Sequence, residues 1–315
     1  MLIKKIYSKY IIARENDLSS FDFFKRIYHS LVDSIFFRLT LWRVCNDREL
    51  AMVVHGQRAK RKIKKIFRDR LSVQTEVKTV ADFPKIIWWS WLQGENEAPE
   101  LAKVCLESLR KNFPDYKIVI VTNDNLDNYV KLPQTILDKF NAGWIKGAHF
   151  ADIIRLNLLA KYGGVWIDAT VFCTDNSLMK IIEKNDMFVY QNLFSQNKGL
   201  IKMSNWLIAS KKGNPYIVES AEILTSYFEK SCYLDDYFIC HIIMSIVSEK
   251  YPDIWNKMPV YNNTDPHMLQ LVIMNKFSEE QYLSIVKRAS FHKLNRHLLL
   301  TDSEYYLYIK HSVGM

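Results

Sequence analysis

The residues best suited to chemistry lie close together between Lys146 and Phe172. Asp152 and Arg155 are three residues apart in a stretch with helical spacing, so an acid and a base share one face of a predicted helix. The pair Gly163-Gly164 ends that helix, and a short apolar strand then places Asp168 at its carboxyl end. Ligands bind beyond the carboxyl ends of strands in open α/β sheets. The segment therefore predicts a polar ligand site.

The elements before this segment follow a strand–helix–strand order. Pro84 to Gly94 is a run of strand-forming residues that ends in glycine, and Tyr116 to Val121 predicts a second strand. Between them, Glu100 to Asn112 has apolar residues at helical spacing, and Pro114 ends this helix. The order implies parallel pairing, so we predict an α/β fold with a mostly parallel, Rossmann-like sheet flanked by helices. Asp124 is interpreted as a turn or helix-cap residue.

A second acidic cluster lies between Tyr233 and His241, where Asp235 and Asp236 are adjacent. Neighbouring carboxylates raise one another's pKa when they are buried. Both are therefore candidates for contact with a donor or acceptor, and Asp236 is a candidate catalytic residue. The alternative is that the pair caps a helix and supplies an acid to its first turn. A strand is predicted at Met187 to Tyr190.

The positive charge of the chain is concentrated at its N-terminus. The formal net charge is +9, and residues 1–70 hold 17 lysines and arginines against 7 acids, net +10, which leaves −1 for the remaining 245 residues. From Arg58 to Arg70, cations interleave with Ile63, Ile66 and Phe67 at helical spacing. Such a helix suits an anionic membrane surface. The alternative is an ordinary helix that packs on the rest of the protein and has a solvated basic face.

Length and composition set the broad class. With 315 residues and 49% hydrophobic side chains, the chain can bury one large domain, predicted over residues 80–315, plus a basic helical arm over residues 1–75. The most apolar early run, Leu31 to Val44, contains Asp33 and two arginines and falls short of the roughly 20 apolar residues of a membrane span.

The same composition limits compartment and partners. Five widely spaced cysteines without a ligand pattern argue against a disulfide framework and a zinc site. We expect a cytoplasmic protein that is peripheral at the inner face of the membrane. No nucleic-acid recognition motif accompanies the basic arm, so nucleic acid is not an expected partner.

The segments Ala151-Asp-Ile-Ile-Arg-Leu156 and Tyr162-Gly-Gly-Val-Trp-Ile-Asp-Ala-Thr170 resemble the DXD-type sugar transferases. The similarity is greatest to bacterial capsular polysaccharide synthesis glycosyltransferases, and the large glucosylating toxins are more distant relatives. It runs from about Phe83 to Lys293 and is strongest between Lys146 and Phe172. The resemblance implies a GT-A fold, a uridine-linked nucleotide-sugar donor and a divalent metal, Mn²⁺ or Mg²⁺.

The resemblance also implies roles for individual residues. Asp152 and Arg155 match the helical pair that holds the ribose and sugar of the donor. Asp168 matches the first Asp of the DXD triplet, which makes it a donor-binding, metal-binding and catalytic candidate. Thr170 stands where the second metal-binding Asp is common, and it offers a neutral hydroxyl instead. This position departs from the family pattern.

Two further segments acquire roles in the same way. Trp91 corresponds to a tryptophan that stacks on the uracil of the donor, and Trp88 is the less favoured candidate. Trp89 is assigned to the core, because alternation along the strand places it opposite the other two. His292 and Lys293 lie where related folds return a basic loop over the donor diphosphate, and they could neutralise the leaving group.

These inferences predict a retaining hexosyltransferase that moves a sugar from a nucleotide donor to a lipid-linked surface or capsular polysaccharide intermediate. Two arrangements would neutralise the leaving diphosphate: a metal held by Asp168 and completed by Asp236 or His292, or His292 and Lys293 taking over part of the metal's role. Thr170 leaves an alternative from another class, a non-catalytic sugar- or lipid-binding protein on the same fold. Slow donor hydrolysis without acceptor would distinguish the enzyme from the binding protein.

Overall fold

The computed structural model describes residues 2–45, 47–73, 79–193, 199–298 and 300–315. Its central sheet has five strands in the order β2-β1-β3-β6-β5. Strand β1 pairs in parallel with β2 and β3, whereas β6 runs antiparallel to β3 and β5, so four of the five strands share one direction. The predicted α/β class with a mostly parallel sheet is confirmed. The strands are β1 (Ile86–Ser90), β2 (Lys117–Val121), β3 (Gly164–Ile167), β5 (Met187–Gln191) and β6 (Met203–Ser210).

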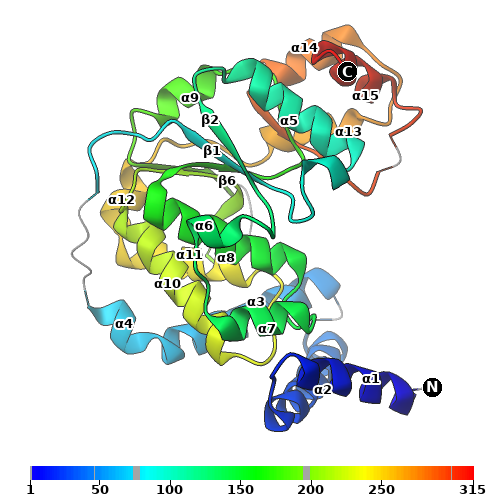
Figure 1. Cartoon of the computed structure of the whole chain (residues 1–315), viewed down its shortest axis with the longest axis vertical. Helices are drawn as coiled ribbons and strands as arrows, with labels where there is room; N and C mark the ends of the chain where they lie inside the picture. Colours follow the sequence, from blue (N-terminus) through cyan, green and yellow to red (C-terminus); the bar gives the residue numbers. More distant parts are fainter. Residues whose placement is uncertain (1, 46, 74–78, 194–198, 299) are drawn as a thin grey trace.

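Helices cover both faces of this sheet (Figure 1). Helices α8, α10 and α11 pack on one face and α5 and α9 on the other. The C-terminal helices α13 to α15 form a further core beyond α5. The helices after the arm are α5 (Glu100–Asn112), α6 (Leu126–Tyr129), α7 (Gln134–Asn141), α8 (Gly147–Tyr162), α9 (Ser177–Ile182), α10 (Pro215–Lys230), α11 (Ile239–Lys250), α12 (Pro252–Lys257), α13 (Met268–Val272), α14 (Glu279–Val286) and α15 (Glu304–Ser312).

Alternation along the strands separates the two cores. Trp88 packs with the α8 side of the sheet and Trp89 with the α5 side, as expected for successive residues of a strand. Trp89 is fully buried, which confirms its assignment to the core. Trp88 is also buried and donates a hydrogen bond from Nε1 to the Gly163 carbonyl at 2.8 Å.

The link between α8 and β3 requires glycine at two successive positions. Gly163 and Gly164 have φ values of 70° and 93°, in the region that L side chains rarely adopt. A Cβ on Gly163 would lie 2.5 Å from the Lys212 amide nitrogen, and one on Gly164 would lie 2.6 Å from the Ile86 carbonyl oxygen. The two glycines therefore let α8 pass into the sheet without a loop.

A small second sheet brings the C-terminal region to the edge of the first. Strand β4 (Val171–Cys173) pairs antiparallel with β7 (Phe291–Lys293), so that Val171 faces Lys293 and Phe172 faces His292. Because β4 begins three residues after Asp168, this pairing places Lys293 beside the predicted ligand site.

The N-terminal arm is helical, as predicted. It consists of α1 (Leu2–Glu15), α2 (Ser20–Thr40), the π-helical turn η1 (Leu41–Cys45), α3 (Arg48–Ile66) and α4 (Arg68–Ser72). Part of the predicted boundary between arm and main domain, residues 74–78, lies outside the described residues. In the part of the chain that the structure describes, no helix combines the length and the apolar character that a bilayer crossing needs.

Several basic residues of the arm bind acidic groups of the main domain. Lys60 Nζ lies 2.8 Å from Glu249 Oε1, and Lys62 Nζ lies 2.8 Å from Asp235 Oδ1. Arg70 Nε reaches the fully buried Glu219 at 2.9 Å. For these residues the structure supports the alternative, a helix that packs on the rest of the protein. The cations that were candidates for contact with lipid form ion pairs with acidic residues of the main domain instead.

Substitution of Lys62 tests whether these contacts between the arm and the main domain stabilise the fold. We expect Lys62→Met to lower the free energy of unfolding by about 1.5–3 kcal/mol, because the buried Asp235 would lose a charged hydrogen-bond partner. Denaturant unfolding of wild type, Lys62→Met and the control Lys65→Met, on an exposed residue of the same helix, measures the effect. Equal losses in the two variants would contradict the structural role.

Candidate active site

Asp168 emerges at the carboxyl edge of the sheet. Strands β1 and β3 are parallel with Trp88 opposite Trp166, so Ser90 and Asp168 leave the sheet at the same level. The Asp168 amide donates a hydrogen bond to the Trp206 carbonyl at 2.8 Å, which fixes the backbone there. Its side chain is 23% exposed and therefore remains accessible to a ligand.

A buried guanidinium joins the two predicted carboxylates. Arg155 Nη2 lies 3.3 Å from Asp152 Oδ1 and 3.2 Å from Asp168 Oδ1. Arg155 is 4% exposed, its Nη1 donates to the Asn205 carbonyl, and its guanidinium lies 5.1 Å from the centre of the Trp166 ring. The predicted pair on α8 and the predicted carboxylate after β3 thus meet in one cluster.

Charge interactions outweigh burial in this cluster. Burial acts to raise the pKa of Asp168, yet Lys293, Arg155 and a hydrogen bond from Trp166 hold that pKa below its ordinary value. Burial likewise acts to lower the pKa of Arg155, and the carboxylates of Asp168 and Asp152 raise it instead. The arrangement therefore keeps Asp168 ionised and Arg155 protonated.

Lys293 completes the cluster on its accessible side. Its Nζ donates to Asp168 Oδ2 at 3.0 Å and to Thr170 Oγ1 at 2.9 Å. The Lys293 side chain is 22% exposed, so it is partly accessible to solvent. Asp168 Oδ2 and Thr170 Oγ1, which the resemblance assigns to a metal, thus both accept hydrogen bonds from Lys293.

Asp152 is held by groups from two other places in the fold. Asn205 of β6 donates from Nδ2 to Asp152 Oδ1 at 2.8 Å, and His149 Nδ1 lies 3.7 Å from Asp152 Oδ2. Asp152 is 7% exposed. These contacts orient its carboxylate toward Arg155.

His241, in the first turn of α11, lies beside the same charges. Burial lowers the pKa of its imidazole to about 4, although Asp152, Asp168 and Asp236 act to raise it. Its Nδ1 is buried without a hydrogen-bond partner among the described residues. At neutral pH an uncharged imidazole therefore lies near these carboxylates.

Trp91 lies just beyond the carboxyl end of β1, at the same edge of the sheet as Asp168. It is partly buried, and the Arg296 guanidinium lies 5.9 Å from the centre of its ring. Arg296 follows β7, so Trp91 and Lys293 belong to neighbouring segments of one rim. Trp88, in contrast, is buried below the edge.

His292 and Asp236 are placed away from the Asp168 cluster. His292 is fully buried, because alternation along β7 points it opposite to Lys293, and its Nε2 lies 3.4 Å from Thr174 Oγ1. Asp236 faces the arm, with Oδ2 at 3.5 Å from His55 Nδ1, and accepts a hydrogen bond from the Phe238 amide. Neither residue is positioned to complete a metal site with Asp168.

Three residues of the cluster had no assigned role in the sequence. Asn205, Trp166 and His241 supply the hydrogen bond to Asp152, the hydrogen bond to Asp168 and the neutral imidazole, respectively. Trp166 follows from strand alternation, since it lies two residues before Asp168 on the same side. Asn205 carried no comparable signal, because its partner is 53 residues away in the chain.

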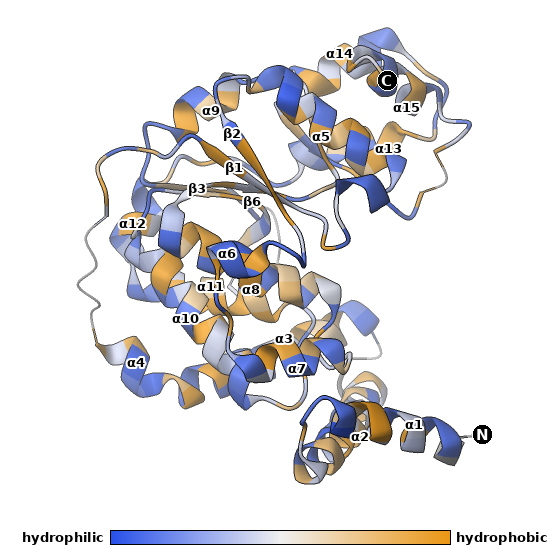
Figure 2. Ribbon diagram, viewed as in Figure 1, coloured by the Kyte–Doolittle hydropathy of each residue, from blue (hydrophilic) through white to orange (hydrophobic). Residues whose placement is uncertain are grey.

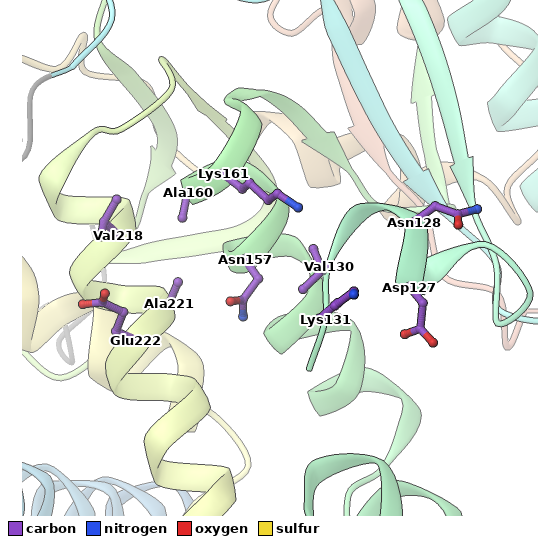
Figure 3. A pocket seen from close by; sticks show the side chains of 10 residues that line it. All are labelled: Asp127, Asn128, Val130, Lys131, Asn157, Ala160, Lys161, Val218, Ala221 and Glu222. Carbon is purple, nitrogen blue, oxygen red and sulfur yellow. The ribbon is translucent and has the colours of Figure 1, made fainter. Parts of the chain in front are cut away.

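A separate hollow of about 540 Å³ lies on the outer side of α8 (Figure 3). Asn157 and Lys161 of α8, Glu222 of α10 and Asp127 of α6 line it. None of the cluster residues around Asp168 lines this hollow. We therefore do not assign it to the active site.

Residues 46–312 match the model of the capsular polysaccharide synthesis protein family. The match takes in α3 of the arm and both carboxylates of the cluster, and it confirms the resemblance seen between Lys146 and Phe172. The chain belongs to the capsular polysaccharide synthesis protein family.

Among curated proteins, the chain is similar to several glycosyltransferases. It is 28% identical over 159 residues to the O-glycosyltransferase braB of Annulohypoxylon truncatum, covering 46% of this chain and 38% of that protein. It is 23% identical over 242 residues to inositol phosphoceramide mannosyltransferase 2 of Schizosaccharomyces pombe, covering 72% of this chain and 63% of the relative. The chain thus spans less than two thirds of the length of these relatives. Among solved structures, the PaToxG glycosyltransferase aligns at a TM-score of 0.39 with 14% identity, over 75% of this chain and 95% of that one.

The buried histidines predict a pH-dependent stability. Burial lowers the pKa of His292 to about 4, so the folded protein keeps it neutral while the unfolded chain protonates it near pH 6.5. Its full contribution is present above about pH 6.5 and is lost as the pH falls toward 4, which amounts to about 2 kcal/mol by pH 5.

We expect His292→Leu to lose less thermal stability than wild type between pH 7 and pH 5. The control is His297→Leu, at an exposed position, which should keep the wild-type dependence. Melting curves at the two pH values measure the difference. The same pH dependence in wild type and His292→Leu would contradict the assignment.

Proposed function

We propose that this chain is a glycosyltransferase that binds a nucleotide-sugar donor, uridine-linked, at the cluster around Asp168. The observation that carries the proposal is a run of alternating charges at the carboxyl edge of the sheet, with Asp152 and Arg155 buried and Asp168 and Lys293 partly exposed. Family membership and similarity to glycosyltransferases support it. A polar site of this kind suits a ligand with hydroxyl groups at one end and phosphates at the other.

Each part of the cluster suits one part of the donor. The carboxylate of Asp152 and the guanidinium of Arg155 would bind sugar and ribose hydroxyls. Lys293, the accessible cation, would bind the diphosphate and stabilise the charge that develops when the glycosidic bond breaks. Trp91, at the rim, would stack on the uracil, a contact typically worth about 1–3 kcal/mol.

The residues present also fit a weakly held divalent metal, Mn²⁺ or Mg²⁺. Asp168 Oδ2 and Thr170 Oγ1 are hard oxygen ligands that converge within 3.0 Å of Lys293 Nζ. In the described parts of the chain, no group of three or more His, Cys, Asp and Glu side chains could hold a metal. We propose that Asp168 and Thr170 would hold such a metal, with its remaining ligands supplied by the donor and water. The metal would neutralise charge on the leaving diphosphate.

The proposed acceptor is a lipid-linked surface or capsular polysaccharide intermediate, and the proposed reaction is hexosyl transfer with retention. Support for a lipid acceptor comes from relatives named for mannosyl transfer to inositol phosphoceramide. Retention follows the resemblance to the DXD-type transferases. Asp236, which faces the arm beside His241, stays a candidate for contact with the acceptor.

Asp168 and Lys293 should both be needed for donor hydrolysis. We expect Asp168→Asn and Lys293→Met to lower the release of nucleoside diphosphate from a uridine-linked sugar at least about a hundredfold, because each removes a charge next to the leaving group. The matched control is Asp186→Asn, on a carboxylate that is 62% exposed and remote from the cluster.

Melting curves must accompany these assays. Asp168→Asn removes a partner of the buried Arg155 and should lower stability, whereas Lys293→Met leaves that ion pair intact. Full hydrolysis by a folded Asp168→Asn would refute the catalytic assignment. A wild-type protein that binds the donor without hydrolysing it would favour the alternative, a sugar-binding protein.

The metal proposal has its own test. We expect Mn²⁺ alone to raise the melting temperature of the wild type little, and Mn²⁺ with UDP to raise it clearly, because phosphates complete the coordination. Thr170→Asp should gain a shift with Mn²⁺ alone, since it adds an anionic ligand. Donor hydrolysis that persists unchanged in a chelator would overturn the proposal and leave Lys293 as the neutralising cation.

A further inference from the structure

The α1–α2 hairpin leaves a long apolar stripe uncovered. In α2 the exposed apolar residues recur every three or four positions, and Trp42 in η1 continues the series. The stripe comprises Phe21, Phe24, Tyr28, Leu31, Ile35, Leu39 and Trp42, which are between 49% and 74% exposed. At about 100° per residue they fall within an arc of about 80°, over a length of about 30 Å. A contiguous exposed patch of this kind marks an interaction surface.

The opposite face of α2 explains why the stripe faces outward. Phe23 is buried in a small core with Trp144. Arg26 donates to the Cys232 carbonyl at 2.8 Å, and His29 stacks on Tyr233 with ring centres 4.4 Å apart. Helix α2 is thus fixed on the protein by one side. The hairpin projects at the end of the molecule opposite α14 and α15 (Figure 1), and α2 carries hydrophobic positions along its length (Figure 2).

Charge selects the partner of this stripe. Exposed cations flank it, and two of them lie against its aromatic rings: Lys25 at 5.8 Å from the centre of Phe21, and Arg43 at 4.9 Å from that of Trp42. The acids of α2 are less exposed and are bound locally, Asp22 by Ser19 and Asp33 by Arg58. A second copy of the stripe would bring like charges together, whereas anionic headgroups would pair with them.

We propose that the α2 stripe is a membrane-docking surface that lies in the interface of an anionic lipid bilayer. Aromatic side chains favour the headgroup level, and flanking cations favour anionic lipid. The cations of α3 that bind Glu249 and Asp235 are not the docking element. Docking on the membrane would bring the enzyme to a lipid-linked acceptor. This purpose rests on the proposed function.

Vesicle sedimentation of the full chain tests the proposal. We expect the triple variant Phe24→Ser, Leu31→Ser, Ile35→Ser to bind phosphatidylcholine–phosphatidylglycerol vesicles at least about tenfold more weakly than wild type, because three large apolar side chains no longer insert. The matched control replaces exposed apolar residues at the far end of the molecule: Leu271→Ser, Met274→Ser, Leu283→Ser. It should bind like wild type.

Two further experiments distinguish lipid from other binding partners. Lys25→Gln, Arg38→Gln, Arg43→Gln should weaken binding to the anionic vesicles and leave binding to pure phosphatidylcholine unchanged. Brominated lipid should quench the fluorescence of wild type more than that of Trp42→Phe. Donor hydrolysis without acceptor should persist in the stripe variant, so a failure of docking and a failure of catalysis give different results.

Two outcomes would overturn the proposal. One is wild-type vesicle binding by the stripe variant. The other is that light scattering without lipid finds a dimer for wild type and a monomer for the stripe variant, while the two proteins bind vesicles equally. That second result would show that the stripe binds a second copy of the chain.

Discussion

The ion pairs around Arg155 constrain the rest of the site. A buried guanidinium without partners would cost several kcal/mol, so this position is tolerable because Asp152 and Asp168 both face it. One carboxylate lies on α8 and the other after β3. The interaction therefore fixes the helix against the strand, and Gly163-Gly164 makes so short a connection between them possible.

The cluster is buried at one end and partly exposed at the other. Asp152 and Arg155 are buried and bound to Asn205, whereas Asp168 and Lys293 keep about a fifth of their surface exposed. Lys293 is the partly exposed cation of the cluster, so a negatively charged ligand such as the proposed diphosphate would meet it first. The buried pair of Asp152 and Arg155 is held by Asn205, an arrangement that would suit the proposed binding of sugar hydroxyls.

Local patterns predicted a large part of this fold. Helix α5 spans the predicted residues Glu100–Asn112, and Asp152, Arg155 and Asp168 meet as expected, because their positions depend on helical spacing and strand ends. Lys293 was predicted through the family resemblance. Its contact with Asp168 joins residues 125 positions apart, and no local periodicity can encode such a pairing.

Charge and apolar patterns in the arm were less informative. A basic amphipathic helix has the same sequence pattern whether it meets lipid or acidic protein groups, and the partners of Lys60 and Lys62 lie more than 170 residues away. The run from Leu31 is too polar for a membrane span, yet such a run can still carry an apolar stripe along one side of α2. The burial of His292 has no clear signal in the sequence, because β7 has three residues, too few for alternation to be recognised.

The pairing of β4 with β7 also sets the order in which the site can form. Asp152, Arg155 and Asp168 leave the ribosome before Lys293, which follows Asp168 by 125 residues. Until then Asp168 has Arg155 as its cationic partner and lacks the accessible ammonium group. Contacts so distant in sequence form slowly, because loop closure precedes the gain from pairing. If the cluster binds a nucleotide sugar as proposed, a growing chain would contain Asp152 and Arg155 before the ammonium group that is proposed to bind the diphosphate.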